Sequence, residues 1–476
     1  MLVYERPDKP DWSFGAEVTE DGRFLLVTQG EGTENKNRVF IQDLGRPGAK
    51  IQPFLDAFDA SYAIVGNDGD TFYVLTNQGA PRYRLVAIRA GRPEPKDWKT
   101  LIPEAQGKVV LQGVAMVNNQ FVVQWMTDAH NTLGIHTLGG AVARDVPLPA
   151  LGSISGLTGR CDHTEAFYSF GSYLYPTAVY RYDFAKGEST VFKKPTLKFD
   201  PSRYETIQVF YPSKDGTTIP MFLTARKGLQ KNGQNPTLLY GYGGFNIPLS
   251  PDFSPAAAGW LEMGGVYAVA NLRGGGEYGQ DWYDAGRLQK KQNVFDDFIA
   301  AAEFLIREKY TSTPKLAIQG GSNGGLLVGA CLAQRPDLFG AALPAVGVMD
   351  MLRFDRFTIG WAWRSDYGQP DKSKEDFDTV MKYSPLHTIK PGTKYPATLV
   401  TTADHDDRVV PLHSFKFTAA LQAAQAGPAP ILIRIETKAG HGAGKPTDKI
   451  IEERADMYGF LMRELKMMLP AEFGGK

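Results

Sequence analysis

The chain is poor in features that would assign it to several other classes of protein. It has only two cysteines in 476 residues, Cys161 and Cys331, and they lie far apart in the sequence. This fits a reducing compartment or simple indifference to the redox state of the surroundings. The sequence contains neither a His-Glu-x-x-His motif nor paired Cys-x-x-Cys motifs. We therefore expect no metal and no other cofactor.

The charge and the hydrophobicity of the chain also give no sign that it binds nucleic acid or a membrane. Lys plus Arg and Asp plus Glu both number 52, so no basic excess is available for phosphate backbones. No run of about 18 apolar residues suggests a membrane span. The first residues lack the apolar stretch of a secretory signal. We expect no nucleic acid partner, no membrane association, and a monomer in the cytoplasm.

A serine flanked by glycines is the strongest chemical signal that the sequence does contain. Residues 315–331 read KLAIQGGSNGGLLVGAC, in which a short apolar strand passes through Gly320-x-Ser322-x-Gly324 into an apolar helix. The glycines permit a sharp strand-to-helix turn, which places the serine hydroxyl at the edge of a sheet and at the positive end of a helix. This pattern predicts a nucleophile elbow at Ser322.

One histidine fits the order that such a serine requires. In α/β-hydrolases the nucleophile is followed along the chain by an acid and then by a histidine. Of the seven histidines, three precede Ser322, and three more lie in segments that suggest loop, helix or packing roles (His387, His405 and His413). His441 remains, between two glycines after a β-rich run, and it is the predicted base.

The acid is expected at the end of a strand. Residues 396–402 have a buried-strand pattern, and the segment after them contains Asp404, Asp406 and Asp407. Open parallel sheets place functional groups at the carboxyl ends of their strands, so each aspartate is a candidate. An aspartate near a helix start also commonly caps the helix, and spacing alone leaves the choice open.

Two segments approach phosphate-binding motifs. Residues 440–445 resemble a P-loop, but Ala439 stands where the first glycine belongs and Pro446 where Ser or Thr belongs. Residues 274–279 satisfy G-x-G-x-x-G after a strand, and Asp296 follows at the appropriate distance. No aliphatic helix follows this second motif, however, so we expect no dinucleotide site.

The first two hundred residues have an all-β pattern with a long internal period. A turn, an aromatic residue and a strand recur, and the marker phenylalanines are 48, 49 and 46 residues apart: Phe24, Phe72, Phe121 and Phe167. Several short strands per unit at this spacing predict propeller blades rather than an irregular β-sandwich. We expect a partial propeller of about four blades over residues 1–197.

The pattern changes after residue 197. Residues 207–223 read as a hairpin, and residues 294–306 as a helix with one apolar face. Strand candidates alternate with helical segments, at 237–240, 266–270, 315–319, 397–402 and 431–436. Alternation of this kind predicts a doubly wound, mostly parallel sheet over residues 198–476, as in an α/β-hydrolase.

Five ordered motifs together resemble the prolyl oligopeptidase (prolyl endopeptidase) family of serine peptidases. They are YGYGGFN at 240–246, NLRGGGEYG at 271–279, GGSNGG at 320–325, DHDDRVVP at 404–411 and AGHGAGK at 439–445. The resemblance implies that Ser322 is the nucleophile, Asp406 the acid and His441 the base. The backbone N–H after the nucleophile, that of Asn323, is one oxyanion donor by geometry. The resemblance supplies the Tyr242 hydroxyl as the other.

By the same resemblance, an apolar pocket receives a proline ring from an oligopeptide substrate. Trp363 would stack on the ring, and Arg408 would donate hydrogen bonds to the carbonyl of the preceding residue. The other implied wall residues are Phe245, Val348, Ile359, Tyr367 and Val409. Taken alone, the aromatic run around Trp363 would be assigned to the core. The absence of an acid from this set disfavours cleavage after Arg or Lys.

The sequence departs from the family in the size of its first domain. Family members carry a seven-bladed propeller and a preceding segment, whereas roughly the first third is missing here. We expect weaker exclusion of long substrates if the disc is incomplete. The favoured function is a serine endopeptidase that cleaves after proline through an acyl-enzyme. The alternatives are a related oligopeptidase, an acylaminoacyl-type exopeptidase or an esterase, and an inactive peptide-binding propeller scaffold.

Overall fold

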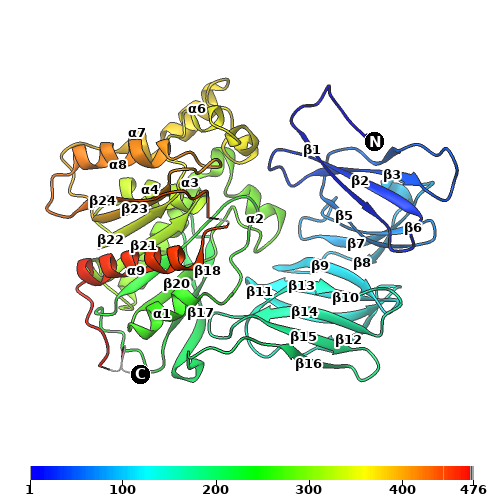
Figure 1. Cartoon of the computed structure of the whole chain (residues 1–476), viewed down its shortest axis with the longest axis horizontal. Helices are drawn as coiled ribbons and strands as arrows, with labels where there is room; N and C mark the ends of the chain where they lie inside the picture. The colour runs from blue at the N-terminus through cyan, green and yellow to red at the C-terminus, as the bar shows by residue number, and fades with distance from the viewer. Residues whose placement is uncertain (1, 443, 472, 474–476) are drawn as a thin grey trace.

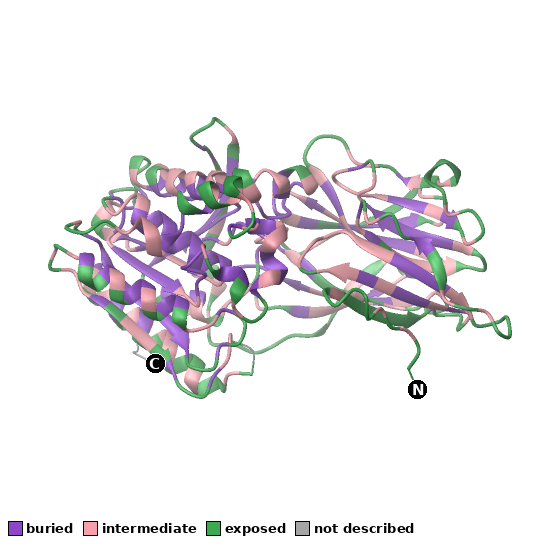
Figure 2. Cartoon of the chain, turned by 90° about the horizontal axis from the view of Figure 1, so that it is seen from above, coloured by how far each residue is buried: buried purple, intermediate pink, exposed green. Residues whose placement is uncertain are grey.

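The computed structural model describes residues 2–442, 444–471 and 473. Two regions of different architecture lie side by side (Figure 1). The N-terminal region consists of small antiparallel sheets, and the C-terminal region is one large sheet flanked by helices. Seen from above, buried residues concentrate in the sheets and on the inner sides of the helices, whereas the turns at the rims are exposed (Figure 2).

Four antiparallel sheets of four strands follow one another in the described part of the N-terminal region. The first contains β1 (Trp12–Val18), β2 (Phe24–Glu31), β3 (Asn37–Asp43) and β4 (Gln52–Leu55). The second contains β5 (Tyr62–Asp68), β6 (Thr71–Thr76), β7 (Arg84–Arg89) and β8 (Lys99–Ile102). The third contains β9 (Val109–Val117), β10 (Gln120–Thr127), β11 (His130–Thr137) and β12 (Val142–Val146). The fourth contains β13 (Ser153–Thr158), β14 (Glu165–Gly171), β15 (Ala178–Asp183) and β16 (Glu188–Lys193).

The periodic phenylalanines mark the second strand of each sheet, as their spacing predicted. Phe24, Phe72 and Phe121 are almost fully buried between neighbouring sheets. Phe167 is only partly buried and packs edge-on against Phe192 of the same sheet, with ring centroids 5.1 Å apart. The prediction of about four repeated β-units is therefore confirmed, and three of the four periodic phenylalanines pack between sheets.

One eight-stranded sheet forms the centre of the C-terminal region, in the order β17-β18-β20-β19-β21-β22-β23-β24. The strands are β17 (Tyr204–Pro212), β18 (Thr218–Arg226), β19 (Thr237–Tyr240), β20 (Val266–Ala270), β21 (Leu316–Gly321), β22 (Ala341–Ala345), β23 (Ala397–Ala403) and β24 (Ile431–Glu436). The first two pair antiparallel, and every pair from β20 to β24 is parallel. The predicted doubly wound, mostly parallel sheet is confirmed.

Helices cover both faces of this sheet. The described helices are α1 (Pro255–Glu262), α2 (Gln280–Asp284), α3 (Gln292–Arg307), α4 (Asn323–Gln334), α5 (Arg364–Tyr367), α6 (Lys374–Met381), α7 (Pro385–Thr388), α8 (Leu412–Ala424) and α9 (Thr447–Glu464). Short 3₁₀ turns are η1 (Pro95–Asp97), η2 (Pro201–Arg203), η3 (Leu288–Lys290), η4 (Thr313–Lys315), η5 (Phe354–Arg356) and η6 (Gly360–Trp363). None of the described helices combines the length and apolar character needed to cross a membrane.

Two hydrophobic cores hold the helices to the sheet. The larger core packs α3, α4 and α8 on one face, and it includes the fully buried Phe298, Leu326 and Phe417. The smaller core packs α1 and α9 on the other face through Trp260 and Leu461. α3 runs from Gln292 to Arg307, two residues earlier and one residue later than the predicted helix, and its buried apolar face lies within the predicted range, from Val294 to Leu305.

The chain order reverses between β19 and β21, and this reversal positions the site. From β19 the chain passes to β20 on one side, then returns to β21 on the other. Such a switch point leaves a crevice at the carboxyl ends of the two strands, where ligands bind in open α/β sheets. The residues after β19 and β21 are the glycine-rich motifs that contain Tyr242 and Ser322.

The two regions pack closely against each other. The turn between β10 and β11 enters the C-terminal region, where Ala129 is fully buried against Tyr173, Phe222 and Val269. The small sheets end at Lys193 and the large sheet begins at Tyr204. A division of the chain between residues 197 and 198 stays a prediction.

Candidate active site

The serine lies at the tip of a sharp turn. Ser322 follows β21 and precedes α4, with φ 59° and ψ −118°, a backbone conformation that L-residues rarely adopt. Two glycines make the turn possible, because a Cβ on Gly320 would lie 2.3 Å from the carbonyl oxygen of Gly324, and one on Gly324 would lie 2.7 Å from that of Gly241. The hydroxyl thus stands at the N-terminus of α4, partly exposed at the sheet edge.

Both predicted oxyanion donors adjoin this serine. Asn323 is the first residue of α4, so its backbone N–H is not used by the helix. Tyr242 follows β19 and lines the same pocket as Ser322. Burial raises the pKa of Tyr242 to about 12, so its hydroxyl keeps its proton at neutral pH and can donate.

The acid and the base are paired. Asp406 is fully buried, and its Oδ2 lies 2.7 Å from Nδ1 of His441. Its Oδ1 accepts from the backbone N–H groups of Arg408 and Val409, at 3.0 and 2.9 Å. Because a carboxylate accepts, Nδ1 of His441 carries the hydrogen, and Nε2 is left to accept a proton.

Within residues 2–442, no hydrogen bond joins Ser322 to His441. The base lies on a loop between β24 and α9 that has positive φ at Lys438 and Gly442, and it is anchored at Ala439 by the hydrogen bond from His405 N. Catalytic hydrogen bonds in ligand-free enzymes are often long and shorten only in the substrate complex. Proton transfer here requires the imidazole to approach the hydroxyl.

The other candidate acids and histidines have different surroundings. Asp404 is exposed and bonded to its neighbour His405, and Asp407 is exposed. His413 is buried in α8, where its Nδ1 accepts from Asp350 N, and burial lowers its pKa to about 4. His387 bonds to Ser384 at 2.8 Å. The buried, triply hydrogen-bonded Asp406 differs from its neighbours in a way that spacing could not reveal.

A pocket of about 270 Å³ opens beside Ser322. Its described walls include the serine, both oxyanion residues and five of the predicted wall residues: Phe245, Val348, Trp363, Tyr367 and Arg408. The ring of Trp363 stacks on Phe354 at 6.5 Å, which fixes its orientation. Among the described residues that line this pocket, none has an acidic side chain.

Two predicted wall residues do not line the pocket. Ile359 is 39% exposed, at the turn before η6, and Val409 is buried in the core behind the acid loop. Two residues that sequence reasoning missed do line it: Thr33 and Ile247. Thr33 belongs to the first small sheet's loop, and its N and Oγ1 donate to the carbonyl of Ala362 at 2.9 and 2.8 Å. No local signal marks Thr33, because the contact spans more than three hundred residues.

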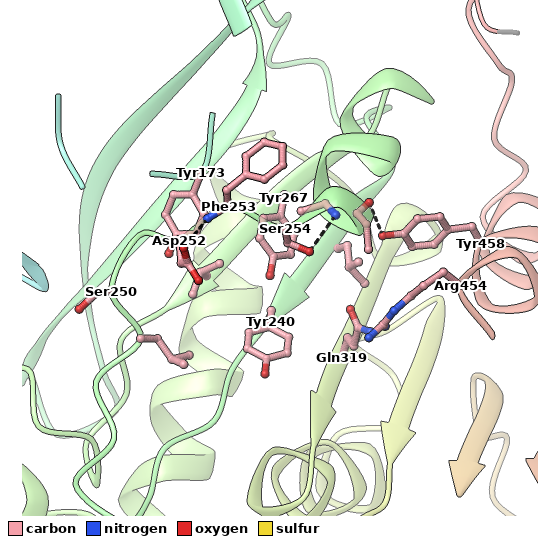
Figure 3. A pocket seen from close by; sticks show the side chains of 15 residues that line it. Tyr173, Tyr240, Ser250, Asp252, Phe253, Ser254, Tyr267, Gln319, Arg454 and Tyr458 are labelled. Atoms are coloured by element: carbon pink, nitrogen blue, oxygen red, sulfur yellow. Dashed lines mark hydrogen bonds between the residues drawn. The ribbon is translucent and has the colours of Figure 1, made fainter. Parts of the chain in front are cut away.

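A second pocket, of about 330 Å³, contains none of the predicted site residues. Figure 3 shows that tyrosines surround it, among them Tyr173 of the N-terminal region, with Arg454 of α9 beside Gln319. Gln319 lies on β21, just before the nucleophile turn. Among the described residues that line this second pocket, no nucleophile is paired with a base. The candidate active site is therefore the pocket beside Ser322.

The motif at residues 271–279 has a structural role. Arg273 is buried and bonds to Asp297 of α3 and to Asp215, while Asn271 donates to the carbonyl of Leu249. The helix after the motif, α2, has only five residues. Asp296 lies on α3 beside Gln292. This arrangement agrees with the expectation that the motif is not a dinucleotide site.

Comparison with known proteins identifies relatives over the whole chain. Residues 251–468 match the model of the prolyl oligopeptidase family, and residues 1–195 match that of its N-terminal β-propeller domain. A prolyl endopeptidase from Elizabethkingia miricola is 47% identical over 448 residues, which cover 94% of this chain and 63% of that protein. The chain thus spans a little under two thirds of this curated relative.

Solved structures agree with the sequence matches. One prolyl endopeptidase superposes with a TM-score of 0.93 at 43% identity, over 98% of this chain and 68% of that one. Prolyl oligopeptidase B from Galerina marginata, bound to a 35mer hydrolysis and macrocyclization substrate, gives a TM-score of 0.94 at 37% identity. This match covers 99% of this chain and 67% of that one. The apo form of the same relative gives a TM-score of only 0.77 at 36% identity, over 98% of this chain and 67% of that one. The N-terminal sheets are a β-propeller region, and the chain belongs to the prolyl oligopeptidase family.

Proposed function

We propose that this chain hydrolyses peptide bonds on the carboxyl side of proline in oligopeptides, through an acyl-enzyme on Ser322. The observation that carries this proposal is the pocket beside the serine. It joins the nucleophile and both oxyanion donors to an apolar, aromatic wall without an acid among its described lining. A flat, uncharged ring suits such a wall, whereas an arginine or lysine side chain would lose its hydration there without a partner.

In the first half of the reaction, Ser322 Oγ attacks the carbonyl carbon of the proline residue and His441 Nε2 takes the hydroxyl proton. Asp406 holds the ring through Nδ1 and stabilises the imidazolium that forms. The carbonyl oxygen becomes negative and accepts from Asn323 N–H and the Tyr242 hydroxyl. The C–N bond then breaks, and His441 returns the proton to the departing amine.

In the second half, water replaces the amine. His441 removes a proton from the water as its oxygen attacks the acyl carbon, and the same oxyanion donors stabilise the second tetrahedral intermediate. The ester bond to Ser322 breaks, and its oxygen regains the proton from His441. Arg408 is exposed and lines the pocket, which supports its proposed role as donor to the carbonyl preceding the proline.

The test compares chromogenic substrates with one another. A blocked Gly-Pro amide should be cleaved at least a hundredfold faster, in kcat/KM, than a blocked Arg amide, an acetyl-alanine amide or a short acyl ester. Ser322→Ala should abolish this activity. Preference for the acetyl-alanine amide would indicate an acylaminoacyl-type exopeptidase, and preference for the ester an esterase. A folded chain that binds the peptides and cleaves none of them would contradict the peptidase proposal and support the inactive scaffold.

A proline-containing oligopeptide is the proposed partner. A monomeric state and a cytoplasmic location stay predictions from the sequence.

A further inference from the structure

A lysine that the proposed mechanism does not use is buried behind the oxyanion site. Lys291 precedes α3, and only 1% of it is exposed. Its Nζ donates to the carbonyl of Gly243 at 2.8 Å and to Oδ1 of Asn323 at 3.2 Å. A buried ammonium loses its hydration, so a lysine is rarely retained in such a place without a specific partner. The partners here are the residue after Tyr242 and one of the two oxyanion residues.

The side chain of Asn323 connects these groups. Its Nδ2 donates to the carbonyl of Tyr242 at 2.6 Å, and its Oδ1 also accepts from the hydroxyl of Tyr367 at 2.7 Å. The side chain of Asn323 therefore connects the two oxyanion residues, Asn323 and Tyr242. Lys291 donates a hydrogen bond to this same side chain. Tyr367 lines the pocket beside Ser322, so the same network reaches the wall of that pocket.

The charged and titratable groups around Lys291 come from neighbouring elements. Asp366 of α5 is fully buried and accepts from Phe245 N and from the hydroxyl of Tyr283. The ring centroid of Tyr367 lies 5.5 Å from Lys291 Nζ. Burial raises the pKa of Asp366, and the positive charges of Lys291 and Arg287 oppose this shift. Burial lowers the pKa of Lys291 to about 8, although Asp366 opposes this shift.

We propose that Lys291 is a positioning residue for the oxyanion site. It fixes Asn323 and the backbone after Tyr242, and it supplies positive charge behind the point where the substrate carbonyl oxygen becomes negative. This role rests on the proposed peptidase function. A preorganised donor pair stabilises the transition state more than the ground state, so loss of the ammonium should lower kcat and leave KM nearly unchanged.

The experiment compares Lys291→Met with Lys290→Met, whose lysine is the exposed neighbour on η3. Nucleophile-competent sites are first counted with a serine-reactive fluorophosphonate, so that misfolded protein does not enter the rates. On a blocked Gly-Pro amide, Lys291→Met should lower kcat about 10- to 100-fold, less than the loss of an oxyanion donor itself. Lys290→Met should match the wild type.

An equilibrium measurement separates positioning from general packing. A peptide that ends in prolinal, an aldehyde, forms a covalent tetrahedral adduct with Ser322. The same peptide ending in proline, with a free carboxylate, binds without forming an adduct. Lys291→Met should weaken the aldehyde by the same factor as kcat and change the affinity for the acid less than threefold. Equal weakening of both ligands, a rise in KM alone, or an unchanged kcat would overturn the role.

The wild-type pH profile decides the matter if Lys291→Met yields no competent sites. With the lysine charge lost at high pH, wild-type kcat should decline with an apparent pKa near 8. A kcat that stays level up to pH 10 would overturn the proposal. Failure of the proposed function has a different signature: the wild type itself would neither cleave the amide nor bind the aldehyde.

Discussion

At the scale of single residues, the surroundings of a side chain decide its role more than its position in the sequence. Asp404, Asp406 and Asp407 all follow the same strand, and only Asp406 is buried with both oxygens hydrogen-bonded. Its two backbone donors come from the turn that follows it. The acid is thus held by its own loop before it orients the imidazole of His441.

Asp406→Asn should lower kcat on the Gly-Pro amide roughly a thousandfold or more. The amide oxygen can still accept from the backbone, so its NH₂ group faces Nδ1 of His441 and favours the wrong tautomer. Asp407→Asn, at the exposed neighbour, is the control and should retain wild-type kcat. Steady-state kinetics and thermal unfolding of both variants provide the measurement. A loss of activity in the control comparable to that in Asp406→Asn would contradict the assignment of the acid.

At the scale of elements, the loop after β20 shows how buried polar groups support the site from outside it. Glu277 is 1% exposed, and its Oε1 accepts from Leu249 N at 3.0 Å and Asn271 Nδ2 at 3.4 Å. Its Oε2 is buried without a hydrogen-bond partner among the described residues. Burial raises the pKa of Glu277 to about 7. The loop after β20 thus holds a carboxyl that keeps its proton to a higher pH than an exposed glutamate does.

This preference makes stability depend on pH. The folded chain binds the Glu277 proton more tightly than the unfolded chain, whose carboxyl has a pKa near 4.5. The stability that the protonated Glu277 carboxyl contributes to the folded chain is therefore fully present below pH 4.5 and is lost as pH rises through 7. The glutamine in Glu277→Gln stays neutral at all these pH values. As pH rises from 5 to 8.5, the free energy of unfolding of Glu277→Gln should therefore increase relative to that of the wild type by about 2–3 kcal/mol.

Urea unfolding at a series of pH values measures this change. Glu262→Gln, at the exposed end of α1, serves as control, and its stability curve should run parallel to that of the wild type. A Glu277→Gln curve that is also parallel to wild type would show that Glu277 does not carry the dependence.

At the scale of the whole molecule, contacts between the two regions complete the pocket. Thr33 of the first small sheet reaches the wall at Ala362, and Gln280 N donates to the carbonyl of Pro81. The turn at Asp128 is bonded to the hydroxyl of Tyr278. The chain superposes better on the substrate-bound structure of the Galerina marginata relative, with a TM-score of 0.94, than on its apo structure, with 0.77.

Ala129→Glu should separate the regions. Ala129 is fully buried in the contact with Tyr173 and Phe222, and an unpaired carboxylate there costs several kcal/mol. We expect a larger radius of gyration in small-angle X-ray scattering and a lower kcat/KM on the Gly-Pro amide. Ala141→Glu, on an exposed turn, should leave both unchanged. An Ala129→Glu protein as compact and as active as wild type would contradict this account of the interface.

The sequence by itself determined the repeated β-units, the parallel sheet and the order of serine, acid and histidine. These features depend on local periodicity and on glycines that the backbone requires at particular turns, as at Gly320 and Gly324. One strand, β22, was missed because its AALPA segment lacks the β-branched residues typical of strands. The family resemblance had singled out Asp406, but only the tertiary structure showed how its burial differs from that of its neighbours, brought Thr33 to the pocket and left Ile359 outside it. Burial and contacts between distant segments arise from packing, and no local pattern encodes them.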